Sequence, residues 1–443
     1  MSFEPRLEET LAALAGAGFG EAEAYAKRGR SRRLRLAVGE RSGSFHDERG
    51  WAVRAATARA SLFACGSGDL EPAAPWPQPD GLPLRLPDPA AGEPWSEPSD
   101  YETPLIGETE GLRLLDAVER TLGEELPGAR LLSAGLEDGS SDSRLASRRG
   151  VAARWRLRVA LLRAEAAVAG GRAGARASLS LAAREARRFG PAAVARQLAD
   201  RLAAAAAGAP EGFTGRDRGE LLLAPAAAAR LLAALVPLFV GPHAVRRIAP
   251  LRDRRGRVAG ERLTLVDDGR LPGGVLEAPV DGEGMPTRAV ALVEAGVFRQ
   301  PLVSWRGARE LGEPQVRAAG CARRASWRDV PATAPSHLHV APDPAVPPAD
   351  LLASLARGYY LLDTAGDPAV DWHAGTFRVP VLGYAVHAGR ARGPIADVWL
   401  TGSLRALLSG IQAVARDLTF FPYDGMIGSS SLLVSGLELR ARP

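Results

Sequence analysis

The segment Gly219–Val240, with the sequence GELLLAPAAAARLLAALVPLFV, constrains the fold of this chain more than any other segment. A short apolar strand runs into an apolar helix, and after Glu220 the segment contains no histidine and no carboxylate. Its length approaches that of a membrane span, but Arg230 lies inside it and a proline stands near each end. A charge and two prolines predict a helix buried in a protein core, with no membrane span.

Periodic apolar residues elsewhere predict both helices and strands, and therefore an α+β fold. Helices are expected at Pro5–Ala15, Glu108–Leu122, Ala192–Ala207 and Ser403–Arg416. Short strands are expected at Ala22–Lys27, Arg33–Val38, Gly43–Asp47, Trp51–Thr57, Ala60–Cys65, Ala129–Leu136, Ser143–Ser147, Val151–Ala166 and Ser431–Leu437. These elements predict an N-terminal sheet-and-helix domain, followed by a C-terminal domain of mostly curved antiparallel sheet.

Two composition breaks divide the chain. Residues 71–100 contain nine prolines, a density that neither a sheet ladder nor a helix interior tolerates, so an extended surface connector is expected there. The segment Gly208–Arg218 is rich in glycine, proline and charge, and it predicts the domain boundary. The expected domains are 1–210, with the 71–100 connector inside it, and 211–443.

Charge and cysteine content limit the classes of partner. The net charge of +5 and the pI near 9.6 come almost wholly from arginine, Lys27 being the only lysine, and acidic residues are interleaved with it. A nucleic-acid surface concentrates its charge on one element, so Arg28–Arg35 and Arg184–Arg188 are interpreted as solvated faces and no nucleic-acid partner is expected. Two isolated cysteines, Cys65 and Cys321, fit a reducing compartment. With no basic, apolar signal at the N-terminus, a cytoplasmic protein is expected.

Short motifs in the second half resemble, in their order and spacing, the TldD/PmbA family, also called modulators of DNA gyrase. They are LTLVDDG at 263–269, DGEGMPT at 281–287, ALVEAGVF at 291–298, GYAVHAG at 383–389, TGSLRALLSGIQAVARDLTF at 401–420 and IGSSSLLVSGLEL at 427–439. The N-terminal third resembles the family's opening run of strands more loosely.

The resemblance implies two kinds of subunit. TldD-like chains carry a zinc-binding His-Glu-x-x-x-His on the helix discussed above and a cysteine ligand near the C-terminus, whereas PmbA-like (TldE-like) chains lack both. In this sequence the corresponding positions begin with Ala233 and Ala234 and end with Leu238, and the segment Phe421–Ser431 contains no cysteine. Methyl groups and leucine can neither hold zinc nor accept a proton from its water. The chain therefore resembles the PmbA/TldE-like subunit, with no catalytic residue, metal or cofactor of its own.

By the same resemblance, a TldD-like catalytic subunit would supply zinc, and the two chains would enclose a chamber for unfolded peptides or leader peptides. Five residues of the DGEGMPT loop are the candidates for the peptide groove: Asp281, Glu283, Gly284, Pro286 and Thr287. The carboxylates of this loop also have the spacing of ordinary turn residues, and a turn is the stronger interpretation of them.

Two alternatives remain open from the sequence. The chain is either this non-catalytic subunit or a stand-alone homodimer that binds peptides without peptidase activity. A third hypothesis is a divergent hydrolase with a relocated metal, held by His337 and His339, which share one side of a predicted strand, or by His373. A pair of exposed histidines on a strand is commoner than a metal site, so this hypothesis ranks last.

Overall fold

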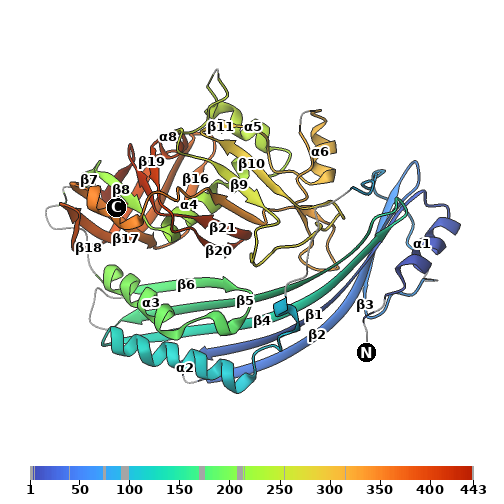
Figure 1. Ribbon diagram of the computed structural model, residues 1–443, viewed down its shortest axis with the longest axis horizontal. Helices are drawn as coiled ribbons and strands as arrows, with labels where there is room; N and C mark the ends of the chain where they lie inside the picture. Colours follow the sequence, from blue (N-terminus) through green and yellow to red (C-terminus); the bar gives the residue numbers. More distant parts are fainter. Residues whose placement is uncertain are drawn as a thin grey trace.

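The computed structural model consists of a long curved sheet and a second β-rich body that lies against it (Figure 1). The structure describes residues 3, 5–38, 40–72, 76–90, 99–168, 175–206, 213, 215–253, 255–314 and 316–441. Strand residues outnumber helical residues in the described chain, and both kinds of element are present, so the predicted α+β class is confirmed.

The N-terminal sheet has six antiparallel strands in the order β3-β2-β1-β4-β5-β6. Their bounds are β1 Glu21–Ala37, β2 Glu40–Ala56, β3 Ser61–Ser67, β4 Ala129–Ser147, β5 Ala152–Val168 and β6 Arg176–Ala183. The prediction of many short strands was wrong, because Ala22–Lys27 and Arg33–Val38 are parts of one strand. The polar residues between them stay in the ladder, as Gly29 pairs with Glu48 on one side and with Ser141 on the other.

Three helices cover one face of this sheet (Figure 1). Helix α1 (Leu7–Gly16) packs on Ala22, Ala24 and Val53 at one end. Helices α2 (Glu108–Glu125) and α3 (Pro191–Ala205) pack on Leu34, Leu136 and Leu162 at the other. Because side chains alternate along a strand, the residues between these positions point to the opposite face, toward the C-terminal half.

The C-terminal half contains a nine-stranded sheet, ordered β19-β22-β8-β15-β17-β18-β23-β7 with β16 on β17, and a six-stranded sheet, ordered β11-β10-β9-β14-β21-β20. Pairing is antiparallel except for β14 with β21 and β15 with β8. The strands are β7 Arg216–Asp217, β8 Glu220–Leu223, β9 Leu265–Asp268, β10 Ala289–Glu294, β11 Val297–Phe298, β12 Ala322–Arg323, β13 Ala332–Thr333, β14 His337–Val340, β15 Arg357–Thr364, β16 Ala369–Asp371, β17 Thr376–His387, β18 Arg390–Ser403, β19 Ile411–Val414, β20 Thr419–Tyr423, β21 Gly425–Ser429, β22 Leu432–Val434 and β23 Glu438–Ala441. The helices of this half are α4 Pro225–Leu235, α5 Ala244–Ile248, α6 Trp305–Leu311, α7 Pro348–Ser354 and α8 Leu404–Ser409. Short 3-10 turns occur here at Val236–Leu238 and Ala249–Leu251, and in the N-terminal half at Ser99–Glu102 and Ala186–Arg188.

The helix predicted at Ser403–Arg416 was wrong in its second half. Ser403 caps α8 as expected, its hydroxyl accepting a hydrogen bond from the Ala406 amide at 3.0 Å. The helix then ends before Gly410, and Ile411–Val414 forms β19 against β22. Apolar residues at 411 and 414 fit either a helix or an irregular strand, and pairing with β22 decides between them. The strand predicted at Ser431–Leu437 was too long: β22 ends at Val434, and Gly436, with a φ of 79°, lies between it and β23.

The Pro-rich connector contains no regular helix or strand in its described part before the turn at Ser99–Glu102, apart from a single bridge between Gly81 and Ser61. Its residues 73–75 and 91–98 lie outside the described residues, as do 207–212 and 214 at the expected domain boundary. The connector still contributes to the core, because Leu86 is buried.

Candidate functional site

Helix α4 carries the positions at which the related zinc motif would stand. Pro225 occupies its first turn and fixes the entry from β8. Ala233 and Ala234 are half-buried near its end, and Leu238 is buried in the 3-10 turn that follows. One turn earlier, Arg230 donates a hydrogen bond to Asp367 at 2.9 Å, and its guanidinium lies 5.0 Å from the ring centroid of Tyr423.

The segment Phe421–Ser431, in which the late cysteine was sought, lies beside α4. Helix α4 packs against β20 and β21, which form most of that segment. Arg230, three and four residues before Ala233 and Ala234, is the one charged residue of α4. Zinc requires imidazole, thiolate or carboxylate ligands, so the side chains at these positions do not fit the ion. Across the described ranges, no three His, Cys, Asp or Glu side chains gather as a metal-binding group.

The 281–287 loop contains a tight turn built around Asp281, as the sequence indicated. The Asp281 Oδ1 accepts hydrogen bonds from the amides of Glu283 at 2.8 Å and Met285 at 3.0 Å, and its Oδ2 accepts one from Ala322 at 2.9 Å. Gly284 has a φ of 82°, and a Cβ there would lie 2.6 Å from a methyl carbon of Val151. The loop therefore packs directly against the N-terminal sheet, and only glycine fits at its point of contact.

A buried ion network joins this loop to the sheet. Arg54 on β2 donates two hydrogen bonds to Glu23 on β1, at 3.0 and 2.7 Å, and also lies 3.7 Å from Glu283. Arg324, which follows β12, binds Glu23 too and donates to the Gly282 carbonyl at 2.9 Å. All four side chains are almost completely buried, so the two halves of the chain share one set of charges in a region of low dielectric.

Burial and pairing set the protonation of the network. Burial alone would raise the pKa of Glu23, but the neighbouring guanidiniums of Arg54 and Arg324 prevail and lower it. Burial, reinforced by the nearby Glu283 carboxylate, raises the pKa of Asp281 to about 7, and burial likewise raises the pKa of Glu283. The Glu23 carboxylate is therefore ionised at neutral pH, while the Asp281 carboxyl takes up a proton near neutral pH.

A cleft between the sheet and the C-terminal half adjoins this network. Its inner part is a cavity of about 90 Å³ and its outer part a hollow of about 510 Å³. Residues that line both parts are Lys27, Ser141, Leu157, Leu276, Arg323 and Arg324. Of the five candidate groove residues, only Asp281 and Thr287 line the cleft; Glu283, Gly284 and Pro286 lie outside its lining.

Several cleft residues escaped the sequence prediction. Tyr25 and Trp155 come from β1 and β5, and Trp327 comes from the segment after β12; with Ala278, they form one buried cluster. The Trp327 ring lies against the backbone of Gly50 so closely that a Cβ at Gly50 would overlap it. Nothing in the sequence links these residues, although alternation along β1 could have shown that Tyr25 shares a strand face with Glu23 and Lys27.

The histidines of the third hypothesis are not brought together as a set. His337 and His339 both lie on β14 and contact Phe420 edge-on, with ring centroids 5.5 and 5.4 Å apart from it. The His337 Nδ1 donates to the Asp268 carbonyl at 2.8 Å, and its Nε2 accepts from the Leu276 amide at 3.2 Å, which leaves His337 no free lone pair. Burial lowers the pKa of both rings. His373 lies elsewhere, in the exposed turn between β16 and β17.

Comparisons with known proteins agree with this architecture. The family described as PmbA/TldA metallopeptidase C-terminal domain matches residues 216–441, about half of the chain. A metalloprotease TldD homolog from Buchnera aphidicola subsp. Schizaphis graminum is 27% identical over 173 residues, which are 39% of this chain and 35% of that protein. An uncharacterized protein from Methanocaldococcus jannaschii is 31% identical over 122 residues, 27% of this chain and 28% of that protein. The matched region thus spans about a third of the length of these relatives.

Solved structures extend the likeness over the whole fold. TldE from Thermococcus kodakarensis superimposes with a TM-score of 0.85 at 18% identity, covering 98% of this chain and 99% of that one. A putative modulator of a DNA gyrase from Thermotoga maritima MSB8 gives a TM-score of 0.81 at 16% identity, with 98% of each chain covered. At these identities the likeness concerns the fold.

Fold and family match together define a metallopeptidase-related protein. The chain belongs to the TldD/PmbA family. As for membranes, none of the helices in the described ranges combines the length and the apolar character that crossing a bilayer requires.

Proposed function

We propose that this chain is the non-catalytic, TldE-like subunit of a heteromeric TldD-type zinc metallopeptidase. The observation that carries the proposal is the face of α4 beside β20 and β21, where both motif positions lie together and neither offers a metal ligand. A TldD-like partner would supply the zinc and the general base. This chain would supply part of the chamber wall and hold the substrate.

The cleft supports the holding role. It lies at the boundary of two domains, which is where ligand sites concentrate, and its lining combines apolar side chains with many polar and charged groups. An extended peptide placed there would contact Leu157 and Leu276 through its side chains and Ser141 through its backbone. Such a site favours unfolded chains, because a folded protein cannot enter. The proposed substrates are therefore leader peptides or unstructured small proteins.

The test is reconstitution with the TldD-like homologue from the same genome. The purified chain, the purified homologue and their mixture are each incubated with an unstructured peptide, and products are followed by mass spectrometry. Cleavage by the mixture alone, lost when the homologue's zinc motif is mutated, is the expected result. Cleavage by this chain alone would reject the proposal.

Light scattering on the same samples separates this proposal from the stand-alone alternative. A heteromer that forms on mixing supports the subunit role. A self-dimer that persists unchanged in the presence of the homologue, and still binds peptide, would support the homodimeric peptide-binding protein instead.

A further inference from the structure

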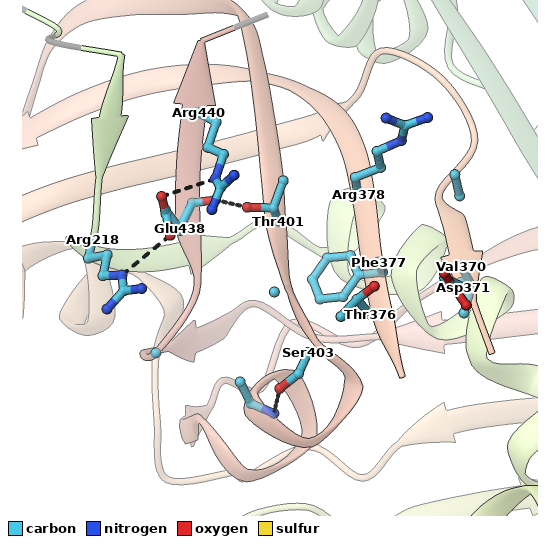
Figure 2. Close-up of a pocket in the computed structure, with 14 residues that line it drawn as sticks. Arg218, Val370, Asp371, Thr376, Phe377, Arg378, Thr401, Ser403, Glu438 and Arg440 are labelled. Carbon is cyan, nitrogen blue, oxygen red and sulfur yellow. Dashed lines mark hydrogen bonds and ion pairs between the residues drawn. The ribbon is translucent and has the colours of Figure 1, made fainter. Parts of the chain in front are cut away.

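An arginine-rich hollow lies on the outer face of the nine-stranded sheet, away from the cleft lining described above. It has a volume of about 700 Å³ and crosses β23, β18, β17 and β16 (Figure 2). Alternation places Leu439, Leu400 and Val379 in the core beneath it. We call it the arginine trough and define it by Arg218, Arg378, Thr401, Glu438 and Arg440, all of which line it.

Positive charge exceeds negative charge in the trough. The Glu438 carboxylate accepts hydrogen bonds from three guanidiniums: Arg216 at 3.0 Å, Arg218 at 3.4 Å and Arg440 at 3.1 Å. Figure 2 shows Arg218, which follows β7, and Arg440, on β23, both reaching this carboxylate. Burial would raise the pKa of Glu438, but the hydrogen bonds from Arg216 and Arg440 lower it. One ionised carboxylate thus faces three cations.

A fourth cation has no carboxylate partner within the described part of the chain. Arg378 is exposed on β17, and its guanidinium lies 5.4 Å from the ring centroid of Trp399. In Figure 2 it points away from Glu438. The other acid in the trough, Asp371, is already engaged, because its Oδ1 accepts from the amides of His373 and Ala374. Arg378 is therefore free to pair with an incoming anion.

We propose that the arginine trough binds an acidic, extended polypeptide segment, with one carboxylate on Arg378 and another on the side of Arg218 and Arg440. The planar guanidinium fork matches a carboxylate with two parallel hydrogen bonds. Arg378 and Arg440 lie on strands separated by β18, so their Cα atoms are on the order of 10 Å apart. Carboxylates about three residues apart in an extended chain span that distance.

The same features disfavour a nucleic acid. A duplex needs a row of cations along its phosphates, whereas this trough presents one unpaired arginine and a cluster that shares Glu438. The Glu438 and Asp371 carboxylates also lie inside it and would repel a continuous run of phosphates. The proposal does not rest on the peptidase partnership, since it concerns this chain by itself.

Fluorescence anisotropy with a labelled oligoglutamate of about ten residues tests the proposal on the full chain, with oligoglutamine as the neutral probe. We expect oligoglutamate alone to bind, and to bind more weakly as salt rises and screens the charges. Arg378→Glu is expected to weaken binding about tenfold or more, while Arg378→Lys, which keeps the charge and loses the fork, weakens it less. The matched control is Arg392→Glu, an exposed arginine at the other end of the β17–β18 hairpin.

Several results would overturn the proposal. One is the absence of oligoglutamate binding at low salt. Another is an equal loss of oligoglutamate affinity in Arg378→Glu and Arg392→Glu, because it would indicate non-specific attraction. Circular dichroism establishes that each variant is folded. A short DNA duplex and unlabelled oligoglutamate are then compared as competitors of the labelled probe. If the duplex displaces the probe at the lower concentration, the trough is reassigned to nucleic acid.

Discussion

The α4 face lies within the C-terminal half and the interdomain cleft lies between the two halves, and they are built from opposite kinds of residue. Around α4 the chain places alanine, leucine and valine where relatives of the zinc-bearing kind need ligands. Around the 281–287 loop it buries carboxylates and guanidiniums, although such groups are expensive to desolvate. The contrast indicates that this chain maintains the groups that shape a cleft and join its walls, and has none that would hold a metal on α4.

The buried ion network gives the largest test of this contrast. Arg54→Ala removes the two-hydrogen-bond partner of Glu23 and leaves Glu283 with less positive charge nearby, so we expect the free energy of unfolding to fall by about 3–5 kcal/mol in urea denaturation. The control is Arg49→Ala on the same strand, whose partner Asp69 and own side chain are both more than half exposed; it should cost at most about 1 kcal/mol. Equal losses of stability in the two variants would show that the buried network contributes no more than an exposed ion pair.

The aliphatic character of the α4 face is tested by Leu238→His. Leu238 is 1% exposed, so an imidazole there loses apolar packing and buries a polar group, and stability should fall by about 2–4 kcal/mol. Val236→His, in the same 3-10 turn but half-buried, is the matched control with the smaller loss. If Leu238→His causes no loss of stability, the α4 face accommodates polar groups, and its contrast with the interdomain cleft weakens.

Asp267 supplies a pH-dependent test in the strand beside the cleft. Burial raises its pKa from 3.8 to about 7, so the folded state keeps a proton that the unfolded state releases near pH 4. Stability from this group therefore falls as pH rises from about 4 to 7, and the cost is complete above pH 7.

Asp267→Asn removes that cost and keeps an oxygen for the Ser336 amide, which now donates to Asp267 at 2.8 Å. We expect the variant to gain on the order of 1–3 kcal/mol over the parent at pH 8 and little near pH 4. Thermal melts across this range measure the difference. A gain that does not depend on pH would show that ionisation of Asp267 is not its source.

The smallest effect on stability, and a selective one on recognition, is expected for Lys27→Ala. Lys27 lines both parts of the cleft and is half-buried, so its loss should change unfolding by about 0.5 kcal/mol or less. In the reconstituted mixture we expect KM for the peptide to rise about three- to tenfold with kcat nearly unchanged. Arg59→Ala, exposed in the turn between β2 and β3, should change neither constant.

Local pattern was sufficient for part of the fold. The strand-to-helix segment around α4, the capped start of α8 and the turn at Asp281 follow from composition, capping and turn chemistry at adjacent positions. The length of β1 and β2 did not follow, because Arg28–Arg32 and Gly43–Gly50 have the composition of turns and only their cross-strand partners keep them extended. The cleft could not be predicted from the sequence either, because Tyr25, Trp155 and Trp327 come together only through tertiary packing.

The contact between Gly50 and Trp327 has a mechanical consequence. Because Gly50 has no side chain, the Trp327 indole packs directly on the backbone of β2, where the N-terminal sheet meets the C-terminal half. Any larger residue there would overlap the indole, so the position of Trp327 in the cleft lining depends on a single backbone position of the N-terminal sheet.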